Sequence, residues 1–407
     1  MKGDLYWAWS SDKAIADSAE CGGAVTSLLK FALDSNQADA VLAVKARDGN
    51  RYDGIPVLID DSDELIGTAG ALHSVSANIA RCLKEYLDGA SDLKVAVTCK
   101  PCDAKAIIEL AKRNQINLEN VLLIGLNCTG TMRPVTAQRM MEEEFGVDPR
   151  DVVREDIGDG KLKVTLRDGK EKETELAEME ARGLGRRENC RRCDLNIPTM
   201  ADIACGKWGT EDRKATFIEV CSERGADLID RAIEGGYVKV EQPSDQAVES
   251  RRAEDWAASE LARQWQERDF AEFQAMSTEE RFNYWFGPSG QFSQCIKCFG
   301  CRDACPICYC KDCYLEADRG AVAGGEIPPD AMFPMIRTVH VIDSCVNCGQ
   351  CQDACPMEIP LARLCFMLNR ELAQIFKYEP GMDVSARPPL RTVTDEELRV
   401  SGVELVL

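Results

Sequence analysis

A chain of 407 residues, 45% hydrophobic and 29% charged, is long enough for two or three domains, which excludes a single small fold. It contains no apolar run near the roughly 18 residues of a membrane span and no apolar secretory signal, so we expect a cytoplasmic protein without a transmembrane segment. The formal charge of −20 argues against a nucleic acid partner, and 21 cysteines in an unsecreted chain favour metal ligands over disulfides.

Residues 1–240 alternate apolar strand-like runs with helix-like runs, which predicts a mixed α/β domain. The alternation on both sides of Asp168-Gly169 predicts a β-hairpin. Other strands are expected at 41–44, 93–98, 120–126 and 216–221. Helices are expected at 23–33, 74–87, 103–112, 136–145 and 224–234.

The segment CGGAVTSLL, residues 21–29, is a candidate cofactor site at the start of an apolar helix. Its residues Cys21, Gly22, Gly23 and Thr26 stand where free backbone N–H groups and the helix dipole favour a phosphate. The alternative is an ordinary helix that begins with glycine. Small, hydroxyl and basic residues elsewhere could line the same dinucleotide site, namely 67–70, Ser74, Ser76, Thr98 and Lys100.

A set of cysteines in the same domain follows predicted strands or forms a C-R-R-C pair. Residues that follow neighbouring parallel strands can meet at one edge of the sheet. We therefore predict a [4Fe–4S] cluster, called the third centre, on Cys102, Cys128, Cys190 and Cys193. A tetrahedral zinc ion is the alternative, because two single cysteines and a C-x2-C pair satisfy it as well.

Residues 241–290 are charged and helix-favouring, which predicts a helical linker. The segment GPSG, at 287–290, marks the entry to the next domain. Residues 366–407 are predicted to form a C-terminal tail that docks on a partner.

Residues 291–365 are predicted to form a small α+β ferredoxin-like domain. Two runs, CIKCFGCRDACP from Cys295 and CVNCGQCQDACP from Cys345, share the spacing C-x2-C-x2-C-x3-C-P. In two-cluster ferredoxins the fourth cysteine of each run binds the other cluster. Structural zinc, the alternative, does not explain the third and fourth cysteines or the proline. The first ferredoxin centre is therefore assigned to Cys295, Cys298, Cys301 and Cys355, and the second to Cys305, Cys345, Cys348 and Cys351.

Three further cysteines, Cys308, Cys310 and Cys313, continue the first run. They could bind metal with one outside ligand, or shield the cluster as small buried residues. The chain has only two histidines, so no hydrolytic His-containing triad can be assembled, and we assign no catalytic residue. His73 is expected to be a polar core or pocket-rim residue rather than a ligand.

Four motifs, CGGAVTSLL, VTCKPCDAKAI, IGLNCTG and ENCRRCDLNIPTMADIACGKWG, resemble the coenzyme F420 hydrogenase/dehydrogenase beta-subunit family. The added ferredoxin segment resembles the members that serve formate dehydrogenases. The resemblance implies FAD, a [4Fe–4S] cluster on the third centre, and hydride exchange with coenzyme F420. It implies FAD contacts at 21–26, Ser74, Thr98, Lys100 and 206–209. One departure is Gly206-Lys207, where members commonly have Gly-Asp; the lysine could face a phosphate instead.

The resemblance implies that an alpha subunit with a molybdenum or tungsten pterin oxidises formate. Electrons would then pass through three [4Fe–4S] clusters to FAD and, as hydride, to F420 as substrate. Heterodisulfide reductase or hydrogenase subunits are further possible partners. Alternatives are an F420H2-oxidising input module and a flavin-free iron–sulfur carrier. The anionic tail of F420 needs a basic pocket, for which we prefer Lys100 and Arg133 among Lys45, Arg47, Lys100, Lys105 and Arg133.

Overall fold

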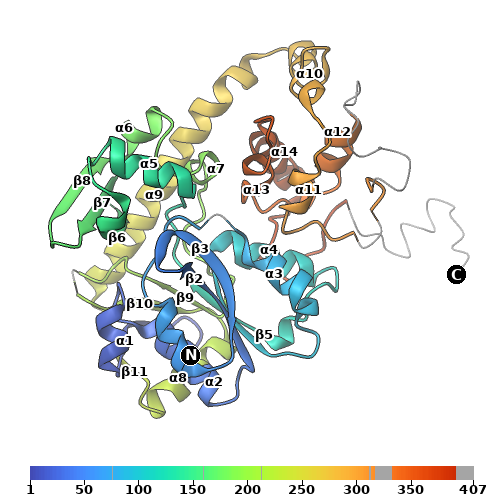
Figure 1. Cartoon of the computed structure of the whole chain (residues 1–407). Helices are drawn as coiled ribbons and strands as arrows, with labels where there is room; N and C mark the ends of the chain where they lie inside the picture. The colour runs from blue at the N-terminus through green and yellow to red at the C-terminus, as the bar shows by residue number, and fades with distance from the viewer. Residues whose placement is uncertain (76, 159, 212, 311–312, 317–331, 391–407) are drawn as a thin grey trace, which may run out of the picture.

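The computed structural model describes residues 1–75, 77–158, 160–211, 213–310, 313–316 and 332–390 (Figure 1). The candidate residue Ser76 and residues 391–407 of the predicted tail lie outside the described residues. Within these ranges no helix is long and apolar enough to cross a membrane.

The N-terminal domain is built on an eight-stranded sheet with the order β11-β1-β10-β9-β5-β4-β2-β3. Strands β2, β4, β5 and β9 run parallel, so their carboxyl ends lie at one edge, and the other neighbours pair antiparallel. The strands are β1 Leu5–Ser10, β2 Ala40–Arg47, β3 Asn50–Ile59, β4 Val95–Cys99, β5 Val121–Leu126, β9 Ile203–Gly206, β10 Thr216–Val220 and β11 Val238–Glu241.

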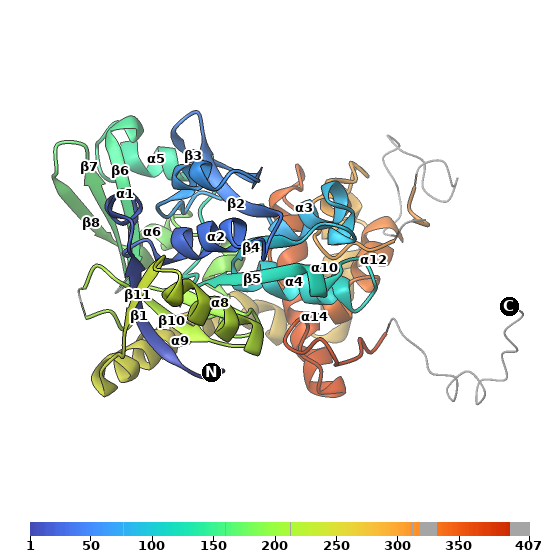
Figure 2. The same cartoon turned by 90° about the horizontal axis from the view of Figure 1, so that it is seen from below.

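Helices cover both faces of this sheet (Figure 2). The core on one face is formed by α2, Ala24–Asp34, and α8, Glu223–Glu234, with α1, Lys13–Ser18, beside them. The core on the other face is formed by α3, Ile79–Tyr86, and α4, Pro101–Ala111. The predicted mixed α/β class of this domain is confirmed.

A smaller antiparallel sheet, β6-β7-β8, has a core of its own. The predicted hairpin is confirmed, because β7 pairs antiparallel with β8 and Gly169 takes a φ of 82° in the turn between them. The strands of this sheet are β6 Val152–Gly158, β7 Lys161–Leu166 and β8 Glu171–Glu175. The helices α5 Pro134–Glu143 and α6 Leu176–Ala181 contribute to its core, and α7 Glu188–Arg191 follows them in the chain. Short 3-10 turns are η1 Ser62–Thr68, η2 Asp88–Ala90, η3 Leu118–Asn120, η4 Pro149–Asp151, η5 Gln291–Gln294 and η7 Ile342–Ser344.

Two helices form the linking segment, and the longer one runs along the molecule toward the C-terminal part (Figure 1). They are α9, Asp245–Ala275, and α10, Thr278–Phe286. The C-terminal part contains α11 Gly300–Asp303, α12 Met332–Val339, α13 Gln350–Asp353 and α14 Leu361–Phe376. Its described residues contain no assigned strand, because the two cysteine runs occupy loops and single helical turns.

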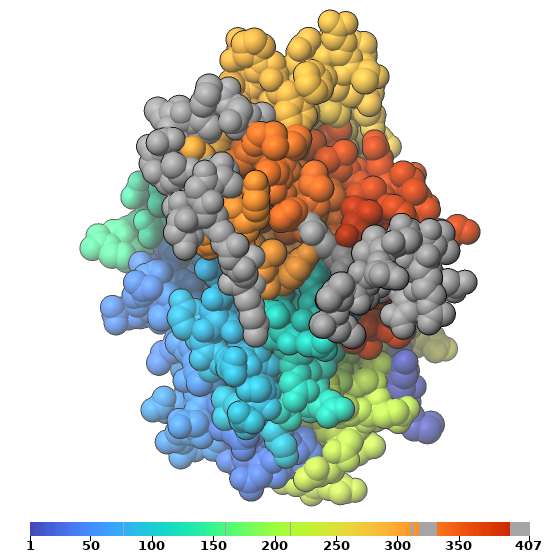
Figure 3. Space-filling model, turned by 90° about the vertical axis from the view of Figure 1, so that its right-hand side faces the viewer, coloured from blue at the N-terminus to red at the C-terminus, as the bar shows by residue number. Residues whose placement is uncertain are grey.

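The ferredoxin-like part packs directly on the α3–α4 face of the first domain (Figure 3). One hydrophobic cluster includes Ile107 and Leu110 of α4 together with Ile307, Val341 and Val346 of the ferredoxin-like part. Burial of apolar side chains from both parts gives the contact a hydrophobic core. The two parts are therefore held in a fixed relation rather than joined only by the linker.

A buried carboxylate fixes the segment after α14 on α4. Glu109 is fully buried and forms ion pairs with Lys112 at 2.8 Å and Arg113 at 2.9 Å. It also accepts hydrogen bonds from the Tyr378 hydroxyl and the Gly381 N–H, both at 2.6 Å. Burial alone would raise the pKa of Glu109, but these donors, led by Lys112, lower it below its ordinary value.

Replacing Glu109 by alanine is expected to lower the free energy of unfolding by about 3–5 kcal/mol, because it leaves two buried cations unpaired. The carboxylate's contribution is present above the pKa of an unfolded glutamate and is lost as the pH falls through the lower folded-state pKa. Urea unfolding at several pH values measures both effects. Glu234→Ala, at an exposed site, is the control. Equal stability of the two variants would contradict the expected role.

Candidate cofactor and cluster sites

A cavity of about 300 Å³, which we call the strand-end cavity, lies at the carboxyl ends of β4, β5 and β9. This edge of a parallel sheet is where α/β domains commonly bind ligands. The strand ends contribute Thr98, Lys100, Asn127, Cys128, Gly206 and Lys207, and the start of α2 contributes Cys21, Gly23 and Thr26.

The first turn of α2 is open to an anion. Gly22 and Gly23 have φ values of 77° and 79°, a conformation that favours glycine. A Cβ atom at Gly22 would lie 2.8 Å from the Lys214 carbonyl oxygen. The N-cap residue Gly23 provides no side-chain hydrogen bond to the helix start. The N–H groups of this turn and the helix dipole therefore suit a phosphate.

Unpartnered polar atoms gather at the strand-end cavity. Neither Nδ2 nor Oδ1 of Asn127 has a partner among the described residues, and the same holds for Nε2 of His73. The hydroxyl of Ser74, beside His73, is also buried without a partner. A buried polar group without a partner costs about 1–3 kcal/mol, so a polar ligand fits this cavity. Donors, acceptors and an open helix start together suit a dinucleotide such as FAD.

Most predicted cofactor residues line this cavity; of the predicted ranges, only Ala24, Gly67, Ala69 and Gly209 and the residues named next lie outside the lining. Gly22 shapes the start of α2, Ser74 lies buried beside the lining residue His73, and Arg133 lies elsewhere. Arg133 is half exposed and pairs with Asp353 in the second ferredoxin run at 2.6 Å. The lining residues are Cys21, Gly23, Thr26, Thr98, Lys100, Gly206 and Lys207.

The cations of the cavity are already paired with acids. Lys100 Nζ lies 2.8 Å from an Asp103 carboxylate oxygen, and Lys207 contacts the Asp156 carboxylate. Burial lowers the pKa of Lys207. The other basic candidates for F420 lie outside the cavity lining. The Lys45 side chain lies beside Gly67, Arg47 forms an ion pair with Asp53 at 3.4 Å, and Lys105 forms one with Glu379 at 3.6 Å.

Sequence reasoning did not single out Asn127 or Asp156. Asn127 directly follows β5 and precedes the predicted ligand Cys128. Its position after a parallel strand could have indicated a residue of the cavity. Asp156 lies in β6 of the small sheet, and nothing in the sequence indicated that this sheet reaches the cavity.

The cysteines of the third centre come from separate elements and lie near one another. Cys102 stands in the first turn of α4, where the buried Asp103 accepts a hydrogen bond from the Lys100 N–H at 2.9 Å. Cys128 lies close enough to Cys102, Cys190 and Cys193 for the charge of one thiolate to affect the pKa of another. Burial raises the pKa of Cys128 to about 11 and that of Cys193 to about 12, so metal binding must displace protons.

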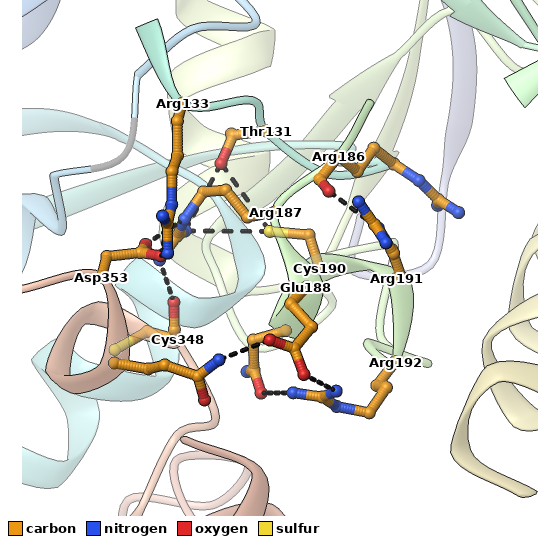
Figure 4. A network of polar contacts seen from close by, with 12 residues as sticks. Thr131, Arg133, Arg186, Arg187, Glu188, Cys190, Arg191, Arg192, Cys348 and Asp353 are labelled. Carbon is orange, nitrogen blue, oxygen red and sulfur yellow. Dashed lines mark hydrogen bonds and ion pairs between the residues drawn. The ribbon is translucent and has the colours of Figure 1, made fainter. Parts of the chain in front are cut away.

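The C-R-R-C loop is held by its own two arginines (Figure 4). Arg191 donates to three carbonyl oxygens, of Glu180, Leu184 and Arg186. The fully buried Arg192 pairs with Asp269 of α9 at 2.7 Å. The linking helix therefore positions two of the predicted ligands.

Each of two small cavities is lined by all four cysteines of one predicted ferredoxin centre. One is lined by Cys295, Cys298, Cys301 and Cys355, the predicted first ferredoxin centre. The other is lined by Cys305, Cys345, Cys348 and Cys351, the predicted second ferredoxin centre, and also by Cys301 and Cys365. The fourth cysteine of each run thus lies with the first three of the other.

The three extra cysteines, Cys308, Cys310 and Cys313, line a further small cavity with His340 and Arg337. Throughout the described part of the chain, no group of three or more His, Cys, Asp or Glu side chains closes around a single ion. This also holds for the cysteines that line the two ferredoxin cavities.

Comparison with known proteins agrees with this architecture. Family models of the coenzyme F420 hydrogenase/dehydrogenase beta subunit match residues 5–84 for its N-terminal part and 92–246 for its C-terminal part. A 4Fe-4S dicluster domain matches residues 291–359. The F420-reducing [NiFe] hydrogenase complex of Methanosarcina barkeri has a chain with a TM-score of 0.57 and 20% identity, covering 67% of this chain and 94% of that one. That likeness supports the fold alone.

Two relatives are similar over nearly their whole length. The F420-dependent formate dehydrogenase subunit beta of Methanocaldococcus jannaschii is 47% identical, covering 94% of this chain and 97% of the relative. F420-dependent formate dehydrogenase 1 subunit beta of Methanococcus maripaludis is 45% identical, covering 96% and 98%.

The fold and the sites define an iron–sulfur oxidoreductase subunit, in which a mixed α/β cofactor domain carries a dicluster ferredoxin domain. Within that class, the chain belongs to the family of F420-dependent formate dehydrogenase beta subunits.

Proposed function

We propose that the chain connects a formate-oxidising subunit to coenzyme F420 by passing electrons through three [4Fe–4S] clusters to FAD. The partner is an alpha subunit with a molybdenum or tungsten pterin, and the complex is cytoplasmic. The observation that carries the proposal is the position of Cys128, which lines the strand-end cavity and is also a neighbour of the other third-centre cysteines. A cluster held there would adjoin the cavity that suits FAD.

The strand-end cavity would hold FAD through groups that now lack partners. The first turn of α2 would bind the pyrophosphate, with Gly22 and Gly23 allowing close backbone approach. Asn127 would supply one donor and one acceptor to the polar edge of the ring. Bound FAD supplies the exchange between single electrons and hydride that F420 requires.

The arrangement of cysteines supports an order for the three centres. Cys348 of the second ferredoxin centre is an electrostatic neighbour of Cys102 in the third centre. The first ferredoxin centre has an exposed ligand, Cys298, which suits contact with a partner. We therefore place the first centre next to the partner, the second in the middle and the third beside FAD. The clusters supply one-electron carriers.

A second candidate is an input module that oxidises F420H2 and sends electrons outward. The same residues would serve this direction, since relative potentials and the partner decide it. Heterodisulfide reductase or hydrogenase subunits would then be the acceptors.

The test is an anaerobic assay of the purified chain with reduced F420 and a viologen dye. We expect F420H2 oxidation and, with NADH at the same concentration, activity at least about 100-fold lower, because the pocket is matched to one donor. Dye reduction by NADH but not by F420H2 would overturn the proposal. Equal absence of both activities in chain with a full flavin content would overturn it too.

A further inference from the structure

One arginine contacts residues of two proposed iron–sulfur centres. Arg187 Nη1 lies 3.8 Å from the Cys190 sulfur, a predicted ligand of the third centre. Its Nη2 donates to the carbonyl oxygen of Cys348, in the second ferredoxin centre, at 2.9 Å (Figure 4). The guanidinium therefore forms a polar connection between the two sets of ligands.

The charge of this arginine is buried and balanced by one carboxylate. The Arg187 side chain is 3% exposed, and its Nε lies 2.5 Å from Asp353 Oδ2. The other oxygen of Asp353 accepts from Arg133, whose side chain is 50% exposed. Arg133 thus shares the carboxylate but touches no cysteine in the contacts that the structure describes.

The surrounding contacts fix the position of the second cysteine run against the C-R-R-C loop. The Asn189 amide donates to the Asn347 carbonyl oxygen, and Gln352 donates to Glu188. Gly349 has a φ of 76°, and a Cβ atom there would lie 2.7 Å from the Asn189 Cβ. The loop can approach this closely because residue 349 has no side chain.

We infer that Arg187 sets the reduction potential of the third centre and that Asp353 opposes it. This inference rests on the proposed function, because it requires a cluster on Cys190. Reduction adds negative charge to a cluster, and a neighbouring cation or N–H donor stabilises that charge. In a buried site the effect of one unit charge is large because water screens it little. Arg187 also positions the second cysteine run, because it donates a hydrogen bond to the Cys348 carbonyl oxygen.

The competing explanation is a structural contact without electronic effect. A purely structural contact would be weakened by removal of either partner, so Arg187→Gln and Asp353→Asn would shift the reduction potential of the third centre in the same direction. An electrostatic role gives opposite signs. Arg187→Gln removes a positive charge and should lower the potential of the third centre, whereas Asp353→Asn removes a negative charge and should raise it.

The test is an EPR-monitored redox titration of the holoenzyme complex with each variant. At the wild-type midpoint of the third centre, we expect the ratio of reduced to oxidised cluster to fall about tenfold in Arg187→Gln and to rise about tenfold in Asp353→Asn. Arg187→Lys should restore part of the loss, because it keeps the charge but not the planar fork. Arg133→Gln is the matched control and should change the ratio less than either.

The outcomes separate this inference from the proposed function. Wild-type chain with iron for only two clusters refutes the third centre itself. Three clusters with unchanged potentials in both variants, or shifts of the same sign, refute the role of Arg187 alone. Iron content and thermal unfolding of each variant, measured first, identify any variant that has lost its fold, and Arg187→Lys then supplies the comparison.

Discussion

Replacing Cys355 by alanine is expected to remove the first ferredoxin centre, although Cys355 belongs to the second cysteine run. Cys355 lines the cavity of Cys295, Cys298 and Cys301, not that of the other cysteines in its own run. Iron should fall by about four atoms per chain, since one [4Fe–4S] cluster is lost. Formate-dependent F420 reduction should fall at least about 100-fold, because one-electron carriers must lie in sequence.

Oxidation of F420H2 with a viologen dye should persist in this variant, because the flavin and the third centre are untouched. Cys298→Ala, at an exposed position, should reproduce the effect without disturbing the interior. Cys82→Ala, in α3 and outside the cluster cavities, is the control and should retain all iron. Loss of the second ferredoxin centre instead of the first would contradict the crossing of ligands.

Replacing Gly206 by valine is expected to abolish flavin binding while the clusters remain. Gly206 ends β9 and lines the strand-end cavity, and a Cβ atom there would lie 2.3 Å from Asn127 Nδ2. The new side chain must displace Asn127 or fill the cavity. Released flavin, measured by fluorescence, should fall below about a tenth of the wild-type content, which corresponds to the loss of one or more polar contacts.

The iron content of the Gly206→Val variant serves as its folding control and should stay near that of wild type. Asn127→Ala offers a second route to the same result, because it removes the two unpartnered polar atoms without adding volume. Its flavin affinity should fall about tenfold or more. Wild-type flavin content in both variants would place the flavin outside this cavity.

Much of the fold follows from the sequence pattern, and the failures have physical reasons. Strands β4 and β5 are continuous apolar runs buried on both faces, so their hydrophobicity predicted them. Strand β11 is a four-residue edge strand with exposed charged residues, and β1, next to it, has buried and half-buried residues without a regular alternation, so both give a weak signal. Strand β9 is only four residues long and lies inside the cysteine-rich motif.

In the candidate sites, too, features set by local sequence could be predicted, whereas contacts between distant parts of the chain could not. Cysteine spacing is local information, and the two ferredoxin cavities group the cysteines as that spacing predicts. Glycines at the start of α2 were also visible in the sequence. The contact of Arg187 with Asp353 joins residues 166 positions apart, so it depends on how two folded parts dock. The pairing of Arg133, predicted to contact F420, with Asp353 depends on the same docking.

The most direct test of the central claim is the cofactor content of the chain purified anaerobically in its complex. We expect about one FAD and about twelve iron atoms with equal sulfide per chain, which is the content of one flavin and three [4Fe–4S] clusters. Chain without flavin, or with about eight iron atoms and one zinc ion, would contradict it.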